Sequence, residues 1–520
     1  MKAKRQLYLL LLFLCAPLTP SVAQPLPISP TTPAPDAGLD LGEAIRLTLE
    51  NDPNIALGEA RLAGARGVLL GAAGQFDPVL TSRVDQEASN VPLTETTSRE
   101  ERSLTSSLGI ARQFRSGLSV TPGLGISRIA APGAGDSAPN VGTLSFAIRQ
   151  PLLQGRGRSV VAASEMSAER EVAASFLDVE QTTAERVVAV VSQYWIARAR
   201  TLDLEILRAS EASSRELLDT TRRLVEADQT PAAELVQLEA NLAAKESSRI
   251  GGERALFAAR QDLGREIGLE PSQISALPLP ADPFPIVHPA DVPPPSEAGR
   301  FLAAALRRRA DLRAARERKS GAEILLRASD DALKPRLDLL FVPTWSGLVA
   351  GNGPGDYVGS LGRNVPGAGA SLGFSLSWPT ANRAARGALA ETEAFRRQTE
   401  LLIDLLSRTV GADVPSALDA VQSSALQVEK ATEAVGLFER AVINEEKKLR
   451  AGTSTLLDLI NQRDRLTAAR QTVVSAQLAL AQALARLRFE TGTLLATEGG
   501  AGALRPELLT SVPSPQETQP

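Results

Sequence analysis

The chain consists of two copies of one unit, and this duplication restricts its fold more than any other feature. Groups of residues in the first half recur in the second half at offsets of 257, 228 and 224 positions. The matching pairs include Arg61 with Arg318, Pro78 with Pro335, Leu144 with Leu372, Pro151 with Pro379, and Leu235 with Leu459. Self-similarity at fixed offsets indicates one supersecondary unit used twice. We therefore predict structural repeats at residues 39–268 and 296–493. A proline-rich linker at 269–295, outside any core, would join them.

The two ends of the chain have the composition of segments outside the repeats. Residues 1–23 combine a basic start, an apolar stretch and a small-residue cleavage site, which is the pattern of a secretory signal peptide. Residues 24–38 are rich in proline, and we predict a flexible lead-in there. Residues 494–520 are rich in Gly, Pro and Ser, and we predict a disordered tail.

The composition leaves few side chains for catalysis or metal binding. The only histidine, His288, lies in the linker, and the only cysteine, Cys15, lies in the predicted signal peptide. These counts exclude most histidine-based catalysis and most zinc or copper sites. The net charge of −4 and the lack of a basic stripe argue against nucleic acid as a partner. We therefore predict no enzymatic activity, no cofactor and no metal site.

Alternation of apolar with small polar side chains predicts strands in both repeats. The strands are expected within 79–151 of the first repeat, and at 336–345 and 370–378 of the second. Both a soluble sandwich and a membrane barrel alternate in this way. The long helices attached to these strands favour the barrel, because they leave no soluble core on which the strands could pack.

The strand region of the first repeat is 29 residues longer than that of the second, which is the difference between the offsets of 257 and 228. The additional length fits either a long outer loop or an extra hairpin made of segments 104–110 and 118–126. The sequence does not choose between these two arrangements.

Long helices make up the rest of each repeat. Residues 158–230 contain neither glycine nor proline. Apolar residues recur every seven positions in the second repeat, at Leu459, Leu466, Val473, Leu480 and Leu487. Such heptads predict a left-handed coiled coil with a partner helix. Each repeat is thus predicted to end in an antiparallel helical hairpin, which turns near 227–231 in the first repeat and 451–455 in the second.

One chain has too few strands to close a barrel by itself. Unpaired strand edges are not tolerated in lipid, and the smallest membrane barrels have eight strands. Two strand pairs supply only four. Several chains would therefore share one barrel, and their helices would form a shared tube.

Short motifs along the chain resemble, in their order and spacing, those of the TolC family of outer-membrane efflux channels. The resemblance extends over residues 39–493. The segments that carry it are Leu41-Gly42-Glu43-Ala44-Ile45, Asn51-Asp52-Pro53, Phe76-Asp77-Pro78, Gln150-Pro151-Leu152, Arg309-Ala310-Asp311-Leu312 and Ala451-Gly452-Thr453.

This resemblance implies a mainly α fold with a membrane β-barrel, built as a homotrimer. The trimeric α-helical periplasmic tube would be continuous with a shared outer-membrane β-barrel of twelve strands. The protein would lie in the outer-membrane lipid of a Gram-negative-type cell and extend into the periplasm. It would be the passive exit duct of a tripartite efflux system. An inner-membrane transporter and a periplasmic adaptor would hand over small molecules or metal ions.

The resemblance also implies where such a channel is narrowest. The family's constriction is an aspartate ring on the second hairpin, and Asp458 and Asn461 occupy the ring positions. Glu234, the counterpart of Asp458 at the 224 offset, is a third candidate. The alternative role for Asp458 is that of a helix N-terminal aspartate stabilised by the helix dipole.

Adaptor contacts are expected at the two hairpin turns. The candidates are Gly452 and Thr453 in the second turn and Ala227 in the first, where the family usually has glycine. Gly452 also has a structural explanation, because glycine permits the positive φ of a tight helix end.

Other functions use similar parts. The outer-membrane channel of a type I protein secretion system has the same scaffold. A periplasmic coiled-coil adaptor also has a long helical hairpin, but only one, set between the halves of a β-domain. A fibrous adhesin lacks this duplication.

Overall fold

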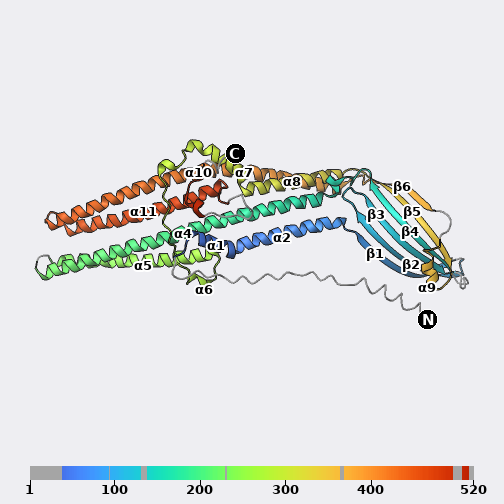
Figure 1. Cartoon of the computed structure of the whole chain (residues 1–520), viewed down its shortest axis with the longest axis horizontal. Coiled ribbons are helices and arrows are strands. Elements are labelled where there is room, and N and C mark those ends of the chain that lie inside the picture. Colours follow the sequence, from blue (N-terminus) through green and yellow to red (C-terminus); the bar gives the residue numbers. More distant parts are fainter. Residues whose placement is uncertain are drawn as a thin grey trace.

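The computed structural model describes residues 38–92, 94–130, 138–228, 231–363, 368–495 and 506–514. The molecule is elongated, with a six-stranded sheet at one end and helical hairpins at the other (Figure 1). The predicted signal peptide and nearly all of the predicted lead-in lie outside the described residues. None of the described helices combines the length and the apolar character of a membrane span.

The first repeat enters the sheet through two short helices and leaves it through a long helical hairpin. Its elements are α1 (Leu41–Asn51), α2 (Pro53–Ala73), η1 (Gly74–Phe76), β1 (Val79–Pro92), β2 (Ser98–Gln113), β3 (Ser119–Ala130), β4 (Pro139–Pro151), α3 (Arg158–Val161), α4 (Ala163–Glu226) and α5 (Ala233–Ile267). Pro53 separates α1 from α2, because proline lacks the N–H that would continue α1 but fits the first position of α2. Asp52 caps α2 by accepting the Asn54 N–H at 2.6 Å, and its other oxygen binds Arg186 of α4.

The second repeat follows the same plan with a smaller strand region. Its elements are α7 (Ala298–Arg308), α8 (Ala310–Asp331), β5 (Arg336–Ala350), α9 (Pro354–Gly359), β6 (Gly369–Ser377), α10 (Arg383–Arg450) and α11 (Leu456–Glu490). The break between α7 and α8 falls at Arg309, whose guanidinium binds Asp311 at 2.7 Å and also binds Glu490. The Arg309-Ala310-Asp311-Leu312 motif therefore ties the start of α8 to the end of α11.

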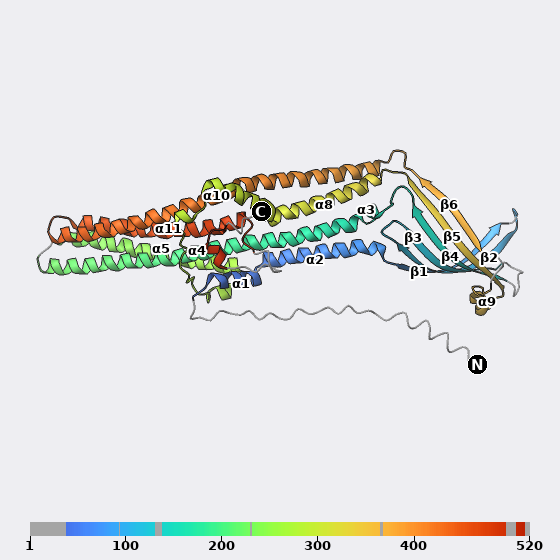
Figure 2. The same cartoon turned by 45° about the horizontal axis from the view of Figure 1, so that its top comes forward.

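All six strands form one antiparallel sheet in the order β1-β2-β3-β4-β5-β6 (Figure 2). On β6, Leu372, Phe374 and Leu376 lie on one face, and each is 68% exposed. The pairing continues this face across the sheet, for example through Trp345 of β5 and Leu144 of β4. One face of the sheet therefore presents apolar side chains to its surroundings, while the opposite face carries many Ser, Thr and Gly residues.

The additional residues of the first repeat form a hairpin, not a loop. Strand β2 pairs with β1 from Val79 to Pro92, and β3 pairs with β4 from Ser119 to Arg128. The described residues therefore form a six-stranded sheet, whereas a twelve-stranded trimer requires four strands per chain. The two possibilities were indistinguishable by sequence because exposed loops and short strands share Ser, Thr and Gly.

The helical part of the molecule is built around Tyr194 and Trp195 of α4, both fully buried. The Trp195 ring stacks on Phe284 at 5.2 Å between centroids. The Tyr194 hydroxyl lies 2.8 Å from both the Leu39 carbonyl oxygen and an Asp282 carboxylate oxygen. Burial raises the pKa of Tyr194 above its usual range.

The prediction that 269–295 lies outside any core is wrong, because Phe284 and its neighbours pack against α4. This segment contains α6 (Pro271–Ile274), η3 (Pro289–Asp291) and the start of η4 (Pro295–Glu297). Its apolar residues Leu277 and Val292 are buried as well. Prolines suit such a segment, since an extended chain that covers helices needs few backbone donors.

The predicted tail is also packed in part. Residues 506–514 are described and include η5 (Pro506–Thr510), in which Leu509 is buried. The Ser511 carbonyl oxygen accepts a hydrogen bond from Arg488 Nε at 3.0 Å. The prediction of disorder is therefore wrong for 506–514, where an apolar side chain and a buried arginine hold the chain in place. Residues 496–505 and 515–520 lie outside the described residues.

Candidate functional site

The two long hairpins end in turns that lie at the same end of the molecule, away from the sheet (Figure 1). The first turn follows α4 at Ala227, and the second joins α10 to α11. The three residues predicted to contact an adaptor, Ala227, Gly452 and Thr453, are all exposed in these turns.

The second turn depends on a left-handed residue at Gly452, which has φ of +70°. The Gly452 N–H donates to the Leu449 oxygen and the Thr453 N–H donates to the Lys448 oxygen, both at 3.0 Å. These bonds satisfy carbonyl groups at the end of α10, as glycine-terminated helices usually do. Glycine is therefore required by the backbone at this position.

The first hairpin turn also contains a residue with positive φ, one position after Ala227. Its left-handed residue is Asp228, with φ of +53°, and not Ala227. Aspartate tolerates this conformation better than most side chains. The absence of glycine at Ala227 is thus explained by a shift of the positive φ to the next residue.

Asp458 lies in the first turn of α11 and completes a capping box with Thr455. Its Oδ2 accepts from the Thr455 hydroxyl at 2.6 Å and from the Thr455 N–H at 3.2 Å, while its own N–H donates to Thr455 Oγ1. The hydrogen bonds from Thr455 hold the pKa of Asp458 below its usual value. Within one chain, Asp458 therefore fulfils the helix-terminal role, and its carboxylate is exposed.

The other two constriction candidates lie near the N-terminal ends of the helices that follow the two hairpin turns. Asn461 is exposed three residues further along α11, and Glu234 is half-buried in the first turn of α5. The two hairpins meet at this end through Leu238 of α5 and Ile460 of α11, which belong to one apolar cluster. The structure thus brings all three polar candidates to the hairpin tips, on two hairpins that contact each other.

Polar contacts between the hairpins were missed by sequence reasoning. Lys245 Nζ of α5 lies 2.5 Å from an Asp464 oxygen of α11. Arg463 donates to the Ser213 hydroxyl of α4 at 2.9 Å and binds Glu446 of α10 at 2.7 Å. A cavity of about 190 Å³, partly lined by Arg463 and Asp464, lies between the hairpins. In the sequence, the only indication of these contacts is that opposite charges lie beside the heptad leucines at 242 and 466.

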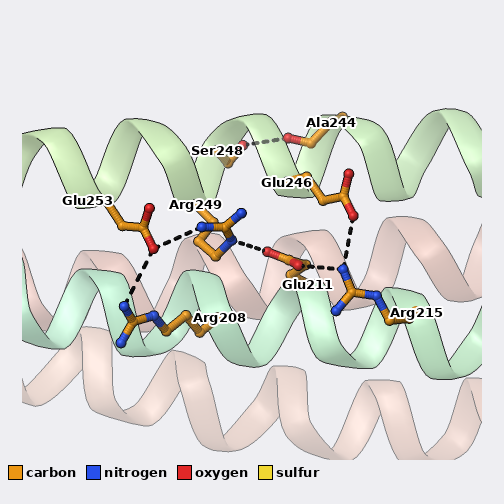
Figure 3. A network of polar contacts seen from close by, with 8 residues as sticks. All are labelled: Arg208, Glu211, Arg215, Ala244, Glu246, Ser248, Arg249 and Glu253. Carbon is orange, nitrogen blue, oxygen red and sulfur yellow. Dashed lines mark hydrogen bonds and ion pairs between the residues drawn. The ribbon is translucent and has the colours of Figure 1, made fainter.

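The first repeat has a heptad series of its own, interrupted once by a charged residue: Leu235, Leu242, Arg249, Leu256 and Leu263. A charged network explains this interruption. Arg249 stands where the heptad of α5 expects an apolar residue, and its Nε donates to Glu211 of α4 at 2.6 Å (Figure 3). Glu211 also accepts from Arg215 at 2.7 Å, and Glu253 accepts from Arg249 at 2.8 Å. Because Glu211 is buried, these partners offset the cost of removing its charge from water. The network therefore replaces an apolar layer of the α4–α5 pair.

The described residues of the hairpin tips include the exposed Asp458 carboxylate and Asn461 amide. Across the described ranges, no group of three or more His, Cys, Asp or Glu side chains has an arrangement that could hold a metal ion. The chemistry of this end of the molecule is that of a charged, hydrogen-bonded surface at the tip of two coiled hairpins.

Comparisons with known proteins give one family and one fold. Residues 301–493 match the family model described as outer membrane efflux protein, so the resemblance predicted from the motifs is confirmed. A search of curated protein sequences finds no match.

Several solved structures are similar along most of the chain. The outer-membrane channel OprN is 18% identical with a TM-score of 0.62, over 87% of this chain and 90% of that one. VceC from Vibrio cholerae is 16% identical with a TM-score of 0.62, over 87% of this chain and 96% of that one. The MtrE channel of Neisseria gonorrhoeae is 16% identical with a TM-score of 0.60, over 87% of this chain and 88% of that one. The likeness establishes a common fold, and both repeats take part in it.

Proposed function

We propose that this chain is a member of the outer membrane efflux protein family, whose model matches residues 301–493, and that it is the outer-membrane channel of a tripartite efflux system. Three copies share one barrel in the outer membrane and one helical tube in the periplasm. The protein is a passive exit duct for small molecules or metal ions. An inner-membrane transporter and a periplasmic adaptor hand over this cargo and supply the energy.

The observation that carries this proposal is an open sheet with an exposed apolar face, joined to very long helices. Leu372, Phe374 and Leu376 of the edge strand β6 are all more than half exposed. A water-soluble sheet would cover such a face, whereas a membrane barrel turns it to lipid and its small polar face to the lumen. Helix α10 has 68 residues, which corresponds to about 100 Å. That length suits a tube that crosses a compartment next to the membrane.

The hairpin tips form the periplasmic mouth in this proposal. Asp458 and Asn461 of three copies line its narrowest ring, with Glu234 beside them. Gly452, Thr453 and Ala227 present the exposed turns that an adaptor contacts. A ring of carboxylates favours cations over anions.

The experiment is ion conduction through planar lipid bilayers by the purified mature chain. Discrete conductance steps with cation preference are expected, and Asp458→Asn should reduce that preference. Asp404→Asn is the matched control, because it removes the same charge from an exposed position of α10 more than 40 residues from the turn.

The proposal fails if the mature chain remains a monomer in water without detergent and forms no conducting pore. If pores form but Asp404→Asn alters selectivity as much as Asp458→Asn does, the assignment of the constriction to the hairpin tips is wrong.

A further inference from the structure

The β2–β3 hairpin lies in the interior of the sheet, between β1 and β4. The second repeat has no counterpart, because there the entering strand β5 pairs directly with the leaving strand β6. In the first repeat, β1 follows α2 and β4 leads to α3, so β2 and β3 are an insertion between them. The question is whether this inserted hairpin belongs to the wall of the barrel.

The pairing register shows that the inserted strands share the inclination of the others. One row of residues that lie opposite each other on neighbouring strands crosses the whole sheet. From β1 to β6 this row consists of Thr81, Gly109, Gly123, Ser145, Thr344 and Gly369. Thr81 lies two residues from the helical end of β1, whereas Gly369 lies eight residues from the helical end of β6. The row therefore shifts by about 20 Å along the strand direction between β1 and β6, which lie about 24 Å apart across the sheet. These two lengths correspond to a strand tilt of about 40° relative to the barrel axis. Closed barrels have tilts of this size, so the whole six-stranded sheet has the geometry of a barrel segment.

The turn of the inserted hairpin is fastened to the helices. Arg115 forms two hydrogen bonds with Glu165 of α4, at 2.7 and 2.5 Å, and its guanidinium lies 4.6 Å from the centre of the Phe76 ring. The Ser116 carbonyl oxygen accepts the Gly157 N–H at 3.0 Å. Charge-assisted paired bonds of this kind fix orientation as well as position. The hairpin is therefore held where barrel and tube join.

The opposite end of the hairpin is fastened by the second repeat. Helix α9, in the connection between β5 and β6, places the Tyr357 hydroxyl 3.0 Å from Ser106 Oγ of β2 and 2.9 Å from the Ile126 oxygen of β3. The Arg128 guanidinium lies 5.3 Å from the centre of the Tyr357 ring. Both ends of the inserted hairpin thus have partners outside β1 and β4, as expected for a built part of the wall.

The inserted strands also continue the two faces of the sheet. Leu108 and Leu124 lie on the apolar face with the exposed leucines of the other strands. Gly109 and Gly123 pair on the opposite face, next to Thr81. A hairpin lying over the sheet would instead bury one face against it.

We infer that the inserted hairpin is part of the barrel wall, so that each copy contributes six strands and three copies close a barrel of eighteen. The copy number rests on the proposed function, whereas the six-stranded contribution rests on the sheet itself. Barrel diameter grows roughly linearly with strand number. At a tilt of about 40° the backbone diameter becomes about 36 Å, compared with about 24 Å for twelve strands. The barrel formed by six strands per copy is therefore wider by about half than a barrel formed by four strands per copy.

Engineered disulfides test the position of the hairpin in the native complex. Thr81→Cys with Gly109→Cys joins β1 to β2, and a Cβ at Gly109 would lie 3.5 Å from the Thr81 hydroxyl oxygen. Thr81→Cys with Ser145→Cys joins β1 to β4, which are about 14 Å apart in this sheet and adjacent only if the hairpin leaves the wall. Ser145→Cys with Thr344→Cys is the control, because β4 and β5 pair in either arrangement.

Formation of the 81–109 and 145–344 disulfides without the 81–145 disulfide is the expected result. An 81–145 disulfide, or failure of 81–109 while the control forms, overturns the six-stranded wall. A detergent-extracted complex of two or four chains overturns the count of eighteen. If the complex conducts ions but forms the 81–145 bond, only this inference fails, and the proposed channel function stands.

Discussion

Gly452 provides a sharp test of how the second hairpin turn is built. Its φ of +70° lies in the left-handed region, and nothing lies within 4 Å of where a Cβ would be added. The substitution Gly452→Ala therefore introduces backbone strain without a steric clash. An L-residue in this conformation costs roughly 1–2 kcal/mol, which corresponds to about a 5- to 30-fold larger opening constant of the turn.

Hydrogen exchange measures this opening directly, because the N–H groups of residues 452 and 453 both donate across the turn. In Gly452→Ala their exchange should accelerate by about 5- to 30-fold. Gly452→Asn should accelerate it less, since asparagine tolerates the left-handed region. Gly436→Ala is the matched control: it lies within α10, where alanine stabilises a helix by about 0.5–1 kcal/mol relative to glycine.

Unchanged exchange in Gly452→Ala would refute the requirement for glycine in the backbone. Equal acceleration in Gly452→Ala and Gly452→Asn would assign the effect to the added side chain and not to the left-handed conformation.

Three further predictions concern the core, the mouth and the outer end. Tyr194→Phe removes the hydroxyl partner of the buried Leu39 carbonyl oxygen, so it should cost about 1–3 kcal/mol and lower the thermal midpoint in circular dichroism; an unchanged midpoint would contradict this. Because hydrogen bonds from Thr455 lower the pKa of Asp458, their contribution is complete above the ordinary value of 3.8 and is lost as the pH falls through the lowered pKa. The protection of amide groups in the first turn of α11, measured relative to the intrinsic exchange rate at the same pH, should therefore fall on acidification in the parent chain but not in Asp458→Asn. Gly142→Ala places a Cβ 2.7–2.8 Å from Ser360 backbone atoms, so it should displace α9 and increase protease cleavage at 351–363, whereas equal cleavage of variant and parent would argue against that contact.

The repeating patterns of the sequence were sufficient to predict the long hairpins and the alternating strands. Heptad leucines such as Leu459 and Leu480 are buried, because a seven-residue period keeps one stripe facing a partner helix. The motifs at Asp52 and Arg309 correspond to breaks between helices that ion pairs fasten to α4 and α11. Local patterns therefore predicted these elements and the resemblance that the family model at residues 301–493 confirms.

What the sequence left undecided depended on contacts between distant segments. The proline-rich stretch lacked periodicity, yet Phe284 is buried because α4 presents Trp195 to it. The inserted hairpin was indistinguishable from a loop until Arg115 and Tyr357 were seen to fasten its two ends. The sequence did not predict a partner for Lys245, because its ion pair with Asp464 forms only where the two hairpins contact each other.

The mass of the complex extracted from membranes in detergent shows whether several copies of the chain assemble. A particle of three chains is expected, because the sheet of one chain has two open edges and the proposed channel closes its barrel and its helical tube with three copies. A particle that contains a single chain and stays in solution without detergent would contradict the account.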